Sequence, residues 1–509
     1  MKNNGSLNRA YRLIWNSARG VWQVASELTP ARGKTKNRNR TVAASTGMLL
    51  FATSSGFAEL PTEGQISAGS GTIQSDGQTM IIQQDGQKMA IDWQQYNIGQ
   101  GNRVEYQQPS AEAIALNRVL GGNPSEIHGS LMANGRIFLI NPNGILFGAG
   151  AQVDVAGILA STLNISNEDF MAGNFEFEGS SGNAIINRGN IVTQDGGFVV
   201  MLAAKIENVG RLNVPGGDVL LGAGQRVRLD LGGPVKIEVE GSVIDSYIKN
   251  GGIIQADGGS VVMTLEAAGN LSSLAINNSG LVQARGLEVG DGGSIRLSAG
   301  PGAVENSGTL DVSSASGQGG KIEMTGDEVA VRSDGRVDAS GATGGGEILL
   351  GGDYLGLNPD VPNAKRTIIE QGAEVLADAT RDGDGGRVIV WSDERTDFAG
   401  RISARGGEEG GDGGFVETSS AKTLNVTGRV STAAPAGVAG QWLLDPEDIE
   451  IGSEEALSDQ DEDEEEEEEE NENTEESQDE QEGGFISSES LQESLDEGSE
   501  VTVYSTGTV

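Results

Sequence analysis

The chain has 509 residues and a formal net charge of -41, with 78 glycines, no cysteine, one histidine and only 4% aromatic residues. The absence of cysteine excludes disulfides and thiol chemistry, and the single histidine, His128, excludes a histidine-rich metal site. The excess of acidic residues argues against nucleic acid as a partner. Glycine at this level, without the three-residue period of collagen, is typical of a turn-dense β architecture.

The first 58 residues have the features of an export signal. Basic residues between Lys34 and Arg40 precede an uncharged run from Thr41 to Phe57, and Gly56 and Ala58 then place small residues at the positions that determine cleavage. This order matches the basic region, apolar region and cleavage site of a signal peptide, with cleavage between Ala58 and Glu59. The alternative is a transmembrane anchor, for which the run is short and rich in Ser and Thr.

Residues 8–16 and 20–27, which contain Trp15 and Trp22, precede this signal. They resemble the extended signal-peptide region of large Gram-negative secreted proteins, the autotransporters and two-partner secretion exoproteins. The resemblance implies that residues 1–58 form one extended signal peptide that delays export across the inner membrane. An amphipathic helix for another partner is the alternative, but it does not explain the signal peptide that follows.

Residues 59–170 read as an amino-terminal module of short strands between Gly and Asn turns. Two apolar runs, residues 137–140 and 145–147, flank the tetrapeptide Asn141, Pro142, Asn143 and Gly144. Proline fixes its own φ, while Asn and Gly tolerate positive φ, so the tetrapeptide predicts a tight turn between buried strands.

With residues 115–122 and 153–161, this region resembles the haemagglutination-activity, or secretion, domain of two-partner secretion exoproteins. That family includes filamentous haemagglutinin and the high-molecular-weight adhesins, and the resemblance continues to about residue 300. It implies a dedicated outer-membrane transporter as partner and a secretion motif at Asn141, Pro142, Asn143 and Gly144. A second family motif, Asn-Pro-Asn-Leu, is absent, which favours the adhesin branch. Whether the four residues are recognised during secretion or only form a turn stays open.

A two-part unit recurs between residues 185 and 451. Its first half is Gly-x-apolar-x-small, and its second half is Gly-Gly followed by alternating residues. The steps from Gly252 to Gly280 and from Gly280 to Gly308 are each 28 residues, whereas the step from Gly335 to Gly372 is 37. A loop between Tyr354 and Lys365 supplies the excess. A period of this length predicts a solenoid.

Alternation within the unit identifies the type of solenoid. Ile295 and Leu297 are predicted to point inward and Arg296 outward, as expected of short strands stacked in parallel on the preceding coil. Gly-Gly pairs are expected at the corners, where neighbouring backbones come close. The fold class is therefore all-β, a parallel β-helix, and its right-handedness is implied by the resemblance alone.

The carboxyl-terminal part contains a strongly acidic stretch, residues 452–484, which is predicted to be a disordered spacer because its dense acidic and polar residues cannot form a packed core. A tail that binds cations or a partner is the alternative. Residues 485–509 are interpreted as the start of a further, truncated block, with a short helix over 485–495 and a strand over 500–504. The sequence does not distinguish a truncated reading frame from a fragment.

Candidate chemical sites are few. Asp382, Asp384 and Asp412 lie in Gly-rich corners that faintly resemble calcium-binding nonapeptide repeats, but no run of such repeats follows. The glycosylation patterns at Asn164, Asn270 and Asn425 are explained by the abundance of Asn and Ser. No catalytic residue, metal or cofactor is predicted.

The resemblance thus implies a secreted or surface-exposed Gram-negative exoprotein. We expect an adhesin that binds a receptor or glycan on a host or neighbouring cell, and not an enzyme. The alternatives are a β-helical polysaccharide-active enzyme, which would need clustered carboxylates across adjacent coils, and the stem of a contact-dependent toxin, which would need a carboxyl-terminal catalytic domain.

Overall fold

A computed structural model describes residues 11–16, 21–26, 60–231, 235–241, 246–266, 274–287, 290–453 and 484–505. The chain divides into two units, Met1–Gly56 and Phe57–Val509. In the first unit, β1 (Tyr11–Asn16) and β2 (Val21–Ser26) form an antiparallel pair in which Trp15 lies opposite Trp22. The predicted cleavage site at Ala58 and Glu59 and most of the predicted acidic spacer lie outside the described residues.

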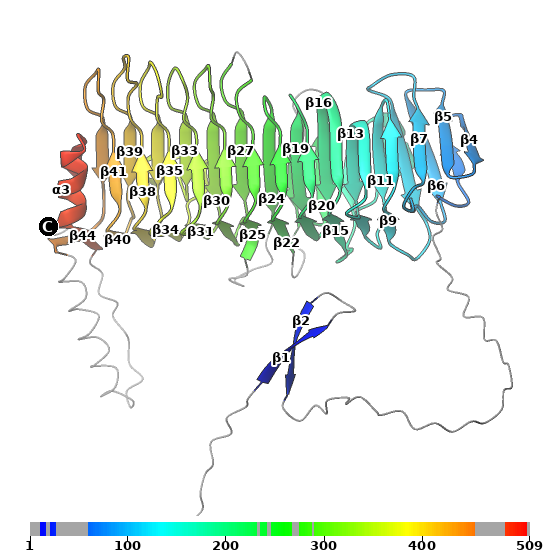
Figure 1. Cartoon of the computed structure of the whole chain (residues 1–509), viewed down its shortest axis with the longest axis horizontal. Helices are drawn as coiled ribbons and strands as arrows, with labels where there is room; N and C mark the ends of the chain where they lie inside the picture. The colour runs from blue at the N-terminus through cyan, green and yellow to red at the C-terminus, as the bar shows by residue number, and fades with distance from the viewer. Residues whose placement is uncertain are drawn as a thin grey trace, which may run out of the picture. The chain divides into compact units, whose positions relative to one another are not determined.

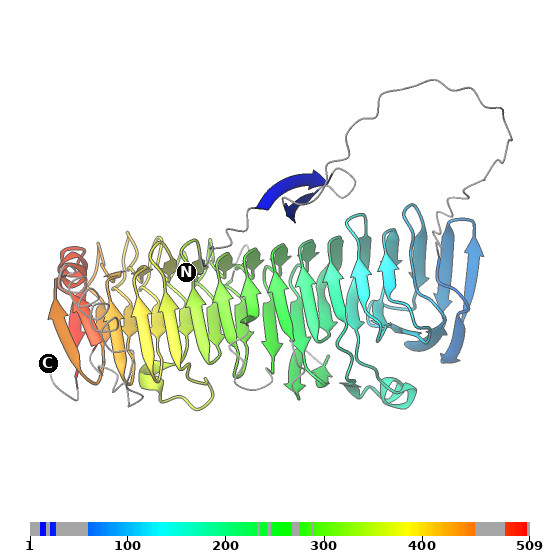
Figure 2. The same cartoon turned by 90° about the horizontal axis from the view of Figure 1, so that it is seen from below.

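The second unit is a parallel β-helix, which confirms the predicted fold class (Figures 1 and 2). Most coils contribute one strand to each of three parallel stacks, here named A, B and C in the order in which the chain visits them. Parallel pairing from coil to coil continues along the whole unit, for example from Ile295 of β27 to Ile322 of β30. In the part of the chain that the structure describes, no helix is long and apolar enough to span a membrane.

Stack A contains β5 (Thr79–Gln84), β7 (Arg103–Gln107), β10 (Ser130–Ala133), the first parts of β13 (Gln152–Ser161) and β16 (Asn190–Leu202), β18 (Arg211–Asn213), β23 (Ile253–Gln255), β26 (Leu281–Gln283), β29 (Thr309–Asp311), β32 (Arg336–Asp338), β35 (Glu374–Leu376), β38 (Arg401–Ser403) and β41 (Arg429–Ser431). Stack B contains β6 (Lys88–Trp93), β8 (Ile114–Val119), β11 (Arg136–Ile140), the second parts of β13 and β16, β19 (Asp218–Ala223), β24 (Ser260–Leu265), β27 (Ser294–Ser298), β30 (Lys321–Thr325), β33 (Glu347–Leu350), β36 (Arg387–Val390), β39 (Phe415–Thr418), β42 (Gln441–Leu444) and β45 (Glu500–Val503).

Stack C contains β9 (Ser125–Ile127), β12 (Ile145–Phe147), β15 (Ala184–Asn187), β17 (Lys205–Asn208), β22 (Tyr247–Asn250), β25 (Leu274–Asn278), β28 (Ala303–Asn306), β31 (Glu328–Val331), β34 (Arg366–Ile369), β37 (Arg395–Phe398), β40 (Thr423–Val426), β44 (Gly484–Ser487) and β43 (Ile449–Gly452). At the amino-terminal end, β3 (Gln65–Ala68) and β4 (Gly71–Asp76) pair antiparallel with β6 and β5. This antiparallel pairing covers the first coil.

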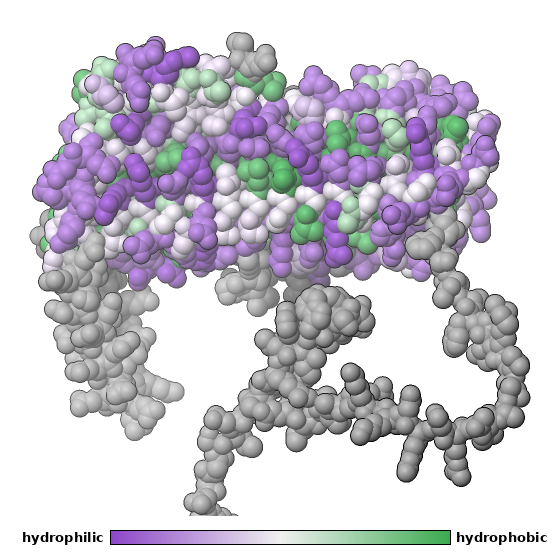
Figure 3. Space-filling model, viewed as in Figure 1, coloured by the Kyte–Doolittle hydropathy of each residue, from purple (hydrophilic) through white to green (hydrophobic). Residues whose placement is uncertain are grey.

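The interior is a continuous apolar core, because alternate side chains of each strand point inward. Ile295 and Leu297 of β27 are at most 1% exposed, whereas Arg296 between them is exposed, as predicted. The outer surface is mostly hydrophilic on the face drawn in Figure 3, with scattered apolar patches. A core this narrow needs small and branched side chains, which explains the scarcity of aromatics.

Glycine forms the corner between stacks A and B, as the sequence predicts. A Cβ on Gly320 would stand 2.1 Å from the carbonyl oxygen of Gly293, and a Cβ on Gly346 would stand 2.0 Å from that of Gly320. Real Cβ atoms do not approach backbone so closely, so any larger residue would push two coils apart. The second glycine of each pair therefore allows the next coil to stack.

Two additions cover parts of the outer face of stack B. The first consists of α1 (Asn167–Ala172) and an antiparallel sheet of β14 (Phe175–Glu178), β20 (Arg226–Asp230) and β21 (Lys236–Glu240). These elements bury a second apolar cluster around Phe138, whose ring packs edge-on against that of Phe170.

The second addition is the excess segment of the repeat, which folds back on the rod. The short 3₁₀ helix η1 (Tyr354–Gly356) lies in this segment, and Val361 packs with Leu349, Ile389 and Trp391 in a third apolar cluster. The predicted loop between Tyr354 and Lys365 is therefore packed against the outer face of stack B.

Residues 484–505 form part of the same rod. β44 pairs with β40, β45 pairs with β42, and α3 (Ser488–Asp496) lies over the end of stack A in place of a strand (Figure 1). Ser494 Oγ accepts from the backbone nitrogen of Val430 at 3.1 Å, and Ser499 Oγ donates to the Val430 carbonyl oxygen at 3.1 Å. Serine hydroxyls thus satisfy the edge groups of β41. The segment boundaries proposed from sequence remain predictions.

Candidate functional site

The predicted turn lies where the chain passes from β11 in stack B to β12 in stack C. Asn141 is fully buried, and its Nδ2 donates to the Asn123 carbonyl oxygen and to Ser125 Oγ, both at 3.0 Å. Its Oδ1 accepts from the backbone nitrogen of Asn143 at 2.9 Å and from Asn143 Nδ2 at 3.1 Å. The side-chain amide of Asn141 therefore uses both its donors and both its acceptor positions inside the protein.

The rest of the motif connects the coil before the turn with the coil after it. Asn143 Nδ2 donates to the Gly121 carbonyl oxygen at 2.8 Å in the preceding coil. The Pro142 carbonyl oxygen accepts from Ser181 Oγ at 2.6 Å and from Asn183 Nδ2 at 2.9 Å in the following coil. The turn therefore joins three successive coils.

Gly144 closes the turn. Its φ is +108°, which L-residues with a side chain rarely adopt, and its nitrogen donates to the Asn141 carbonyl oxygen at 3.0 Å. Within the tetrapeptide only Pro142 is exposed. In the folded protein the motif therefore presents one side chain to solvent, and its amides hold coils together.

Beneath the amino-terminal cap lies a buried polar network that centres on Asn117, a residue of the stretch that carries the family resemblance. Asn117 Oδ1 accepts from Trp93 Nε1 at 2.9 Å and from the Tyr106 hydroxyl at 2.6 Å. The Tyr96 and Tyr106 hydroxyls lie 3.0 Å apart, and burial raises the pKa of both phenols. Such a satisfied network favours one arrangement of the first coils.

A ladder of buried asparagines follows, which the sequence interpretation missed. The five ladder residues each end a strand of stack C, and the Nδ2 of each of the first four donates to the Oδ1 of the next at 2.7 to 2.8 Å. They are Asn187, Asn208, Asn250, Asn278 and Asn306, and none is exposed. The ladder therefore runs through the interior along the rod axis.

A signal for the ladder was present in the repeat. Each ladder residue stands two positions before the glycine that begins the next unit, as Asn278 does before Gly280 and Asn306 before Gly308. The corner geometry requires the glycine, since a Cβ on Gly308 would stand 2.1 Å from the Gly280 carbonyl oxygen. An Asn-x-Gly pattern at a fixed period thus indicates an amide ladder beside a glycine corner.

The aspartates of the Gly-rich corners have structural contacts. Asp384 Oδ1 accepts from the backbone nitrogen of Asp412 at 2.7 Å, and Asp412 Oδ1 accepts from the backbone nitrogen of Val438 at 2.8 Å. Asp382 pairs instead with Gly410 through a backbone bridge. Among the residues that the structure describes, no group of three or more His, Cys, Asp or Glu side chains could hold a metal ion. The carboxylates of Asp384 and Asp412 therefore link successive corner loops.

His128 lies at the end of β9, well away from the corner aspartates in sequence. Its Nε2 is 3.4 Å from a carboxylate oxygen of Glu126, and its side chain is 41% exposed. A Cβ on Gly148 would stand 2.2 Å from the His128 ring, so glycine in the next coil makes room for the imidazole. The ring therefore has a packing role in the first coils.

Comparisons with known proteins agree with this architecture. The family of the TPS secretion domain matches residues 58–312, and that of the extended signal peptide of the type V secretion system matches residues 8–56. The crystal structure of the HMW1 secretion domain from Haemophilus influenzae superposes with a TM-score of 0.63 at 32% identity, over 75% of this chain and 100% of that one.

Two curated relatives are heme/hemopexin-binding proteins of Haemophilus influenzae. One, from strain Rd, is 32% identical over 234 residues, which are 44% of this chain and 25% of the relative. The other is 37% identical over 136 residues, which are 26% of this chain and 15% of the relative. The chain thus spans a quarter or less of the length of these relatives.

An amino-terminal export signal followed by a capped parallel β-helix defines an exported solenoid of the type V secretion system. More particularly, the chain belongs to the two-partner secretion exoproteins, because the secretion-domain family covers half of its length. It is exported through the periplasm to the cell surface or the extracellular space. The secretion domain implies a dedicated outer-membrane transporter as the partner in that step.

Proposed function

We propose that this exoprotein is an adhesin that contacts another cell through the side of its rod. The observation that carries the proposal is the continuation of regular coils beyond residue 312, where the match to the secretion-domain family ends. These coils add an extended, ordered lateral surface, and solenoids use such surfaces for binding. The relatives are named for secretion or binding, which supports a binding role.

The test is adhesion of the exported protein itself. The chain is co-produced with its transporter, purified from the culture medium and offered to epithelial cells and to neighbouring bacterial cells. Saturable binding that the unlabelled protein competes away is the expected result. If the protein binds saturably to none of these cell types, the adhesin proposal is contradicted.

Haem binding is a second candidate, because both curated relatives are named heme/hemopexin-binding proteins. Titration of the exported protein with hemin separates the two candidates. A saturable Soret shift at stoichiometric hemin would favour the haem role, and its absence together with cell binding would favour adhesion. A His128→Ala control reports whether the single imidazole is involved.

For the motif, we propose that Asn141, Pro142, Asn143 and Gly144 act in secretion by forming the turn that joins the first coils. Buried amides that satisfy one another are costly to remove, so Asn141→Ala should lower the free energy of unfolding by about 3 kcal/mol, and Asn143→Ala by about half of that. We expect Asn141→Ala to impair secretion and refolding together.

The matched control is Pro142→Ala, since Pro142 is the exposed residue of the motif. Secretion into the medium and refolding from urea are measured for all three variants. Lost secretion with normal refolding, above all in Pro142→Ala, would show direct recognition by the transporter and contradict the folding role.

A further inference from the structure

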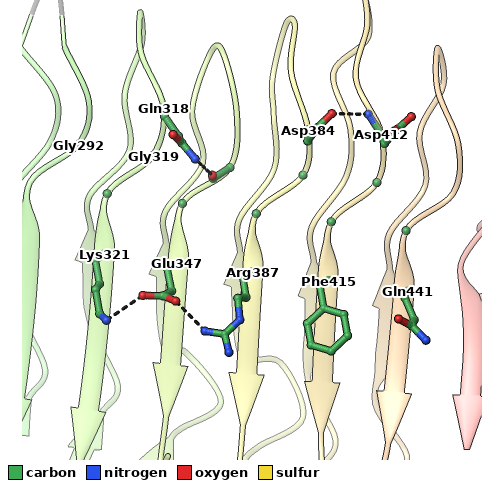
Figure 4. Close-up of a pocket in the computed structure, with 18 of the residues that line it drawn as sticks. Gly292, Gln318, Gly319, Lys321, Glu347, Asp384, Arg387, Asp412, Phe415 and Gln441 are labelled. Atoms are coloured by element: carbon green, nitrogen blue, oxygen red, sulfur yellow. Dashed lines mark hydrogen bonds and ion pairs between the residues drawn. The ribbon is translucent and has the colours of Figure 1, made fainter. Parts of the chain in front are cut away.

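A groove runs along the outer face of stack B, where the corner loops meet the strands. It has a volume of about 870 Å³. Its floor is a row of side chains, one from each of five successive strands, that lie side by side in Figure 4. In order along the rod they are Lys321, Glu347, Arg387, Phe415 and Gln441.

The corner loops and the inserted segment meet the floor of the groove in different ways. On one side stand the stacked corner loops, which contribute Gln318, Asp384 and Asp412 above the row in Figure 4. The inserted segment does not line the groove but contacts two residues of its floor, since Asp353 Oδ1 accepts from Arg387 Nη2 at 2.6 Å and Tyr354 packs against Phe415. The insertion of the repeat therefore lies where the row changes from charged to uncharged residues.

The charges of the floor compensate one another. Lys321 Nζ lies 2.8 Å from a carboxylate oxygen of Glu347, and Arg387 donates to Glu347 at 2.7 Å and to Asp353 at 2.6 Å. Two cations and two anions thus form one continuous chain of ion pairs. The rod around them is strongly acidic, so an anionic polymer would gain little from this floor and would be repelled by its surroundings.

The uncharged end of the row offers aromatic surface. The rings of Tyr354 and Phe415 meet edge to face, with centroids 5.9 Å apart and an angle of 60° between planes. Tyr354 is 43% exposed, and Phe415 is half-buried. An exposed aromatic face beside hydrogen-bonding groups suits the apolar C–H face and the hydroxyls of a sugar ring.

The inserted segment is fixed before any ligand arrives. A Cβ on Gly356 would stand 2.5 Å from the Trp391 ring, and that ring packs with Val361 beneath the segment. The backbone nitrogen of Leu355 donates to both carboxylate oxygens of the buried Glu417, at 3.2 and 3.4 Å. Prior fixing of a binding surface lowers the entropy cost of association.

From this geometry we propose that the groove binds a linear, electrically neutral glycan chain, with sugar units stacked on Phe415 and Tyr354. Successive strands are about 4.8 Å apart, close to the rise of one sugar unit in an extended chain, so each strand can present its side chain to one unit. This inference rests on the proposed function, adhesion, and names its ligand class and its site.

The test uses the exported full-length protein and a panel of neutral pentasaccharides, namely cellopentaose, xylopentaose, maltopentaose and chitopentaose, with a pentamer of galacturonic acid as the anionic arm. Calorimetric titration should detect at least one neutral oligosaccharide. Phe415→Ala and Tyr354→Ala should each raise its Kd about tenfold. Gln441→Ala is the third groove variant, at an exposed position of the floor. Tyr504→Ala is the control, because it removes an exposed tyrosine outside the groove.

Binding of no neutral oligosaccharide, or equal affinity in wild type and all three groove variants, would overturn the site. Preference for the galacturonic acid pentamer would overturn the neutral ligand class. The same variants are then applied to cells. Undiminished cell adhesion by Phe415→Ala leaves the adhesin proposal standing while the groove fails as its site, whereas a wild type that binds no cells refutes adhesion independently of the groove.

Discussion

The coils from β15 to β28 and the coils beyond them occupy the same interior corner with opposite chemistry. In the first region, the last residue of each stack C strand from β15 to β28 is an asparagine of the ladder. In the second region the equivalent residues are apolar, namely Val331, Ile369, Phe398 and Val426. The change falls close to residue 312, where the match to the secretion domain ends.

The difference shows two ways of fixing register in one backbone geometry. A ladder amide bonds only when the next coil is in register, because a slip of one residue points the neighbouring side chain outward. An apolar stack contributes more burial but tolerates small shifts, since dispersion and burial have no direction. The coils from β15 to β28 are thus specified by hydrogen bonds between amides, and the coils beyond them by burial with glycine corners.

The largest expected effect comes from placing an asparagine in the apolar stack. Ile369→Asn removes a buried side chain and leaves an amide between Val331 and Phe398, so the free energy of unfolding should fall by about 5 kcal/mol in urea titrations. Val331→Asn should cost about 3 kcal/mol, because Asn306 can donate to the new amide oxygen.

Ile368→Asn is the control, since it makes the same change at the neighbouring, outward-facing position. If Val331→Asn and Ile369→Asn lower the free energy of unfolding equally, then proximity to the ladder does not stabilise the new amide, and the contrast between the regions is wrong.

A second prediction concerns the inserted segment, which covers part of the outer face of stack B in the second region. The cover on the second region buries a carboxylate, and this burial raises the pKa of Glu417 to about 7 from an ordinary value of 4.5. The folded protein therefore holds this proton more tightly than the unfolded chain. The resulting stabilisation is fully present below pH 4.5 and is lost as the pH rises toward 7, by on the order of 3 kcal/mol.

Glu417→Gln should remove this pH dependence while keeping an acceptor for Leu355. Hydrogen exchange at the Leu355 amide, followed from pH 5 to pH 8, gives the local readout. An unchanged pH profile of protection in the variant would mean that Glu417 does not control the inserted segment.

The smallest expected effect comes from interrupting the ladder. Asn278→Ala leaves Asn250 without its side-chain acceptor and Asn306 without its side-chain donor, so the free energy of unfolding should fall by about 2 kcal/mol. Asn277→Ala, at the neighbouring half-buried position, should change it far less. Equal effects from the two substitutions would show that the ladder amides have no special role in stability.

The repeat period of the sequence predicted the body of the rod well, because every coil of a stacked fold needs the same kinds of residue at the same positions. Gly292 and Gly293 recur in each unit since no Cβ fits at the corner, and Ile295 and Leu297 alternate with Arg296 since one face is buried. Residues that every coil needs can therefore be recognised in the sequence, because they recur at the period of the repeat.

The two additions that cover the outer face of stack B could not be predicted from periodicity, since each occurs once. Their signal is a continuous apolar run where alternation is expected, as in residues 137–140 and 388–391. Phe138 and Ile389 are the outward members of these runs, and both are buried beneath a cover. The groove depends on the second cover, and its ion pairs join residues up to 40 apart in the chain, which no local pattern reveals.

The order of strands at the carboxyl-terminal end of stack C has a consequence for folding during export. β44 lies between β40 and β43, although β43 precedes it in the chain. Every earlier coil can be added as its residues emerge, each on the one before. At this end, β43 becomes available first, and β40 must remain accessible until residues 484–487 arrive. Assembly at this point therefore includes an insertion between two strands, and that step waits until the chain has passed the acidic stretch.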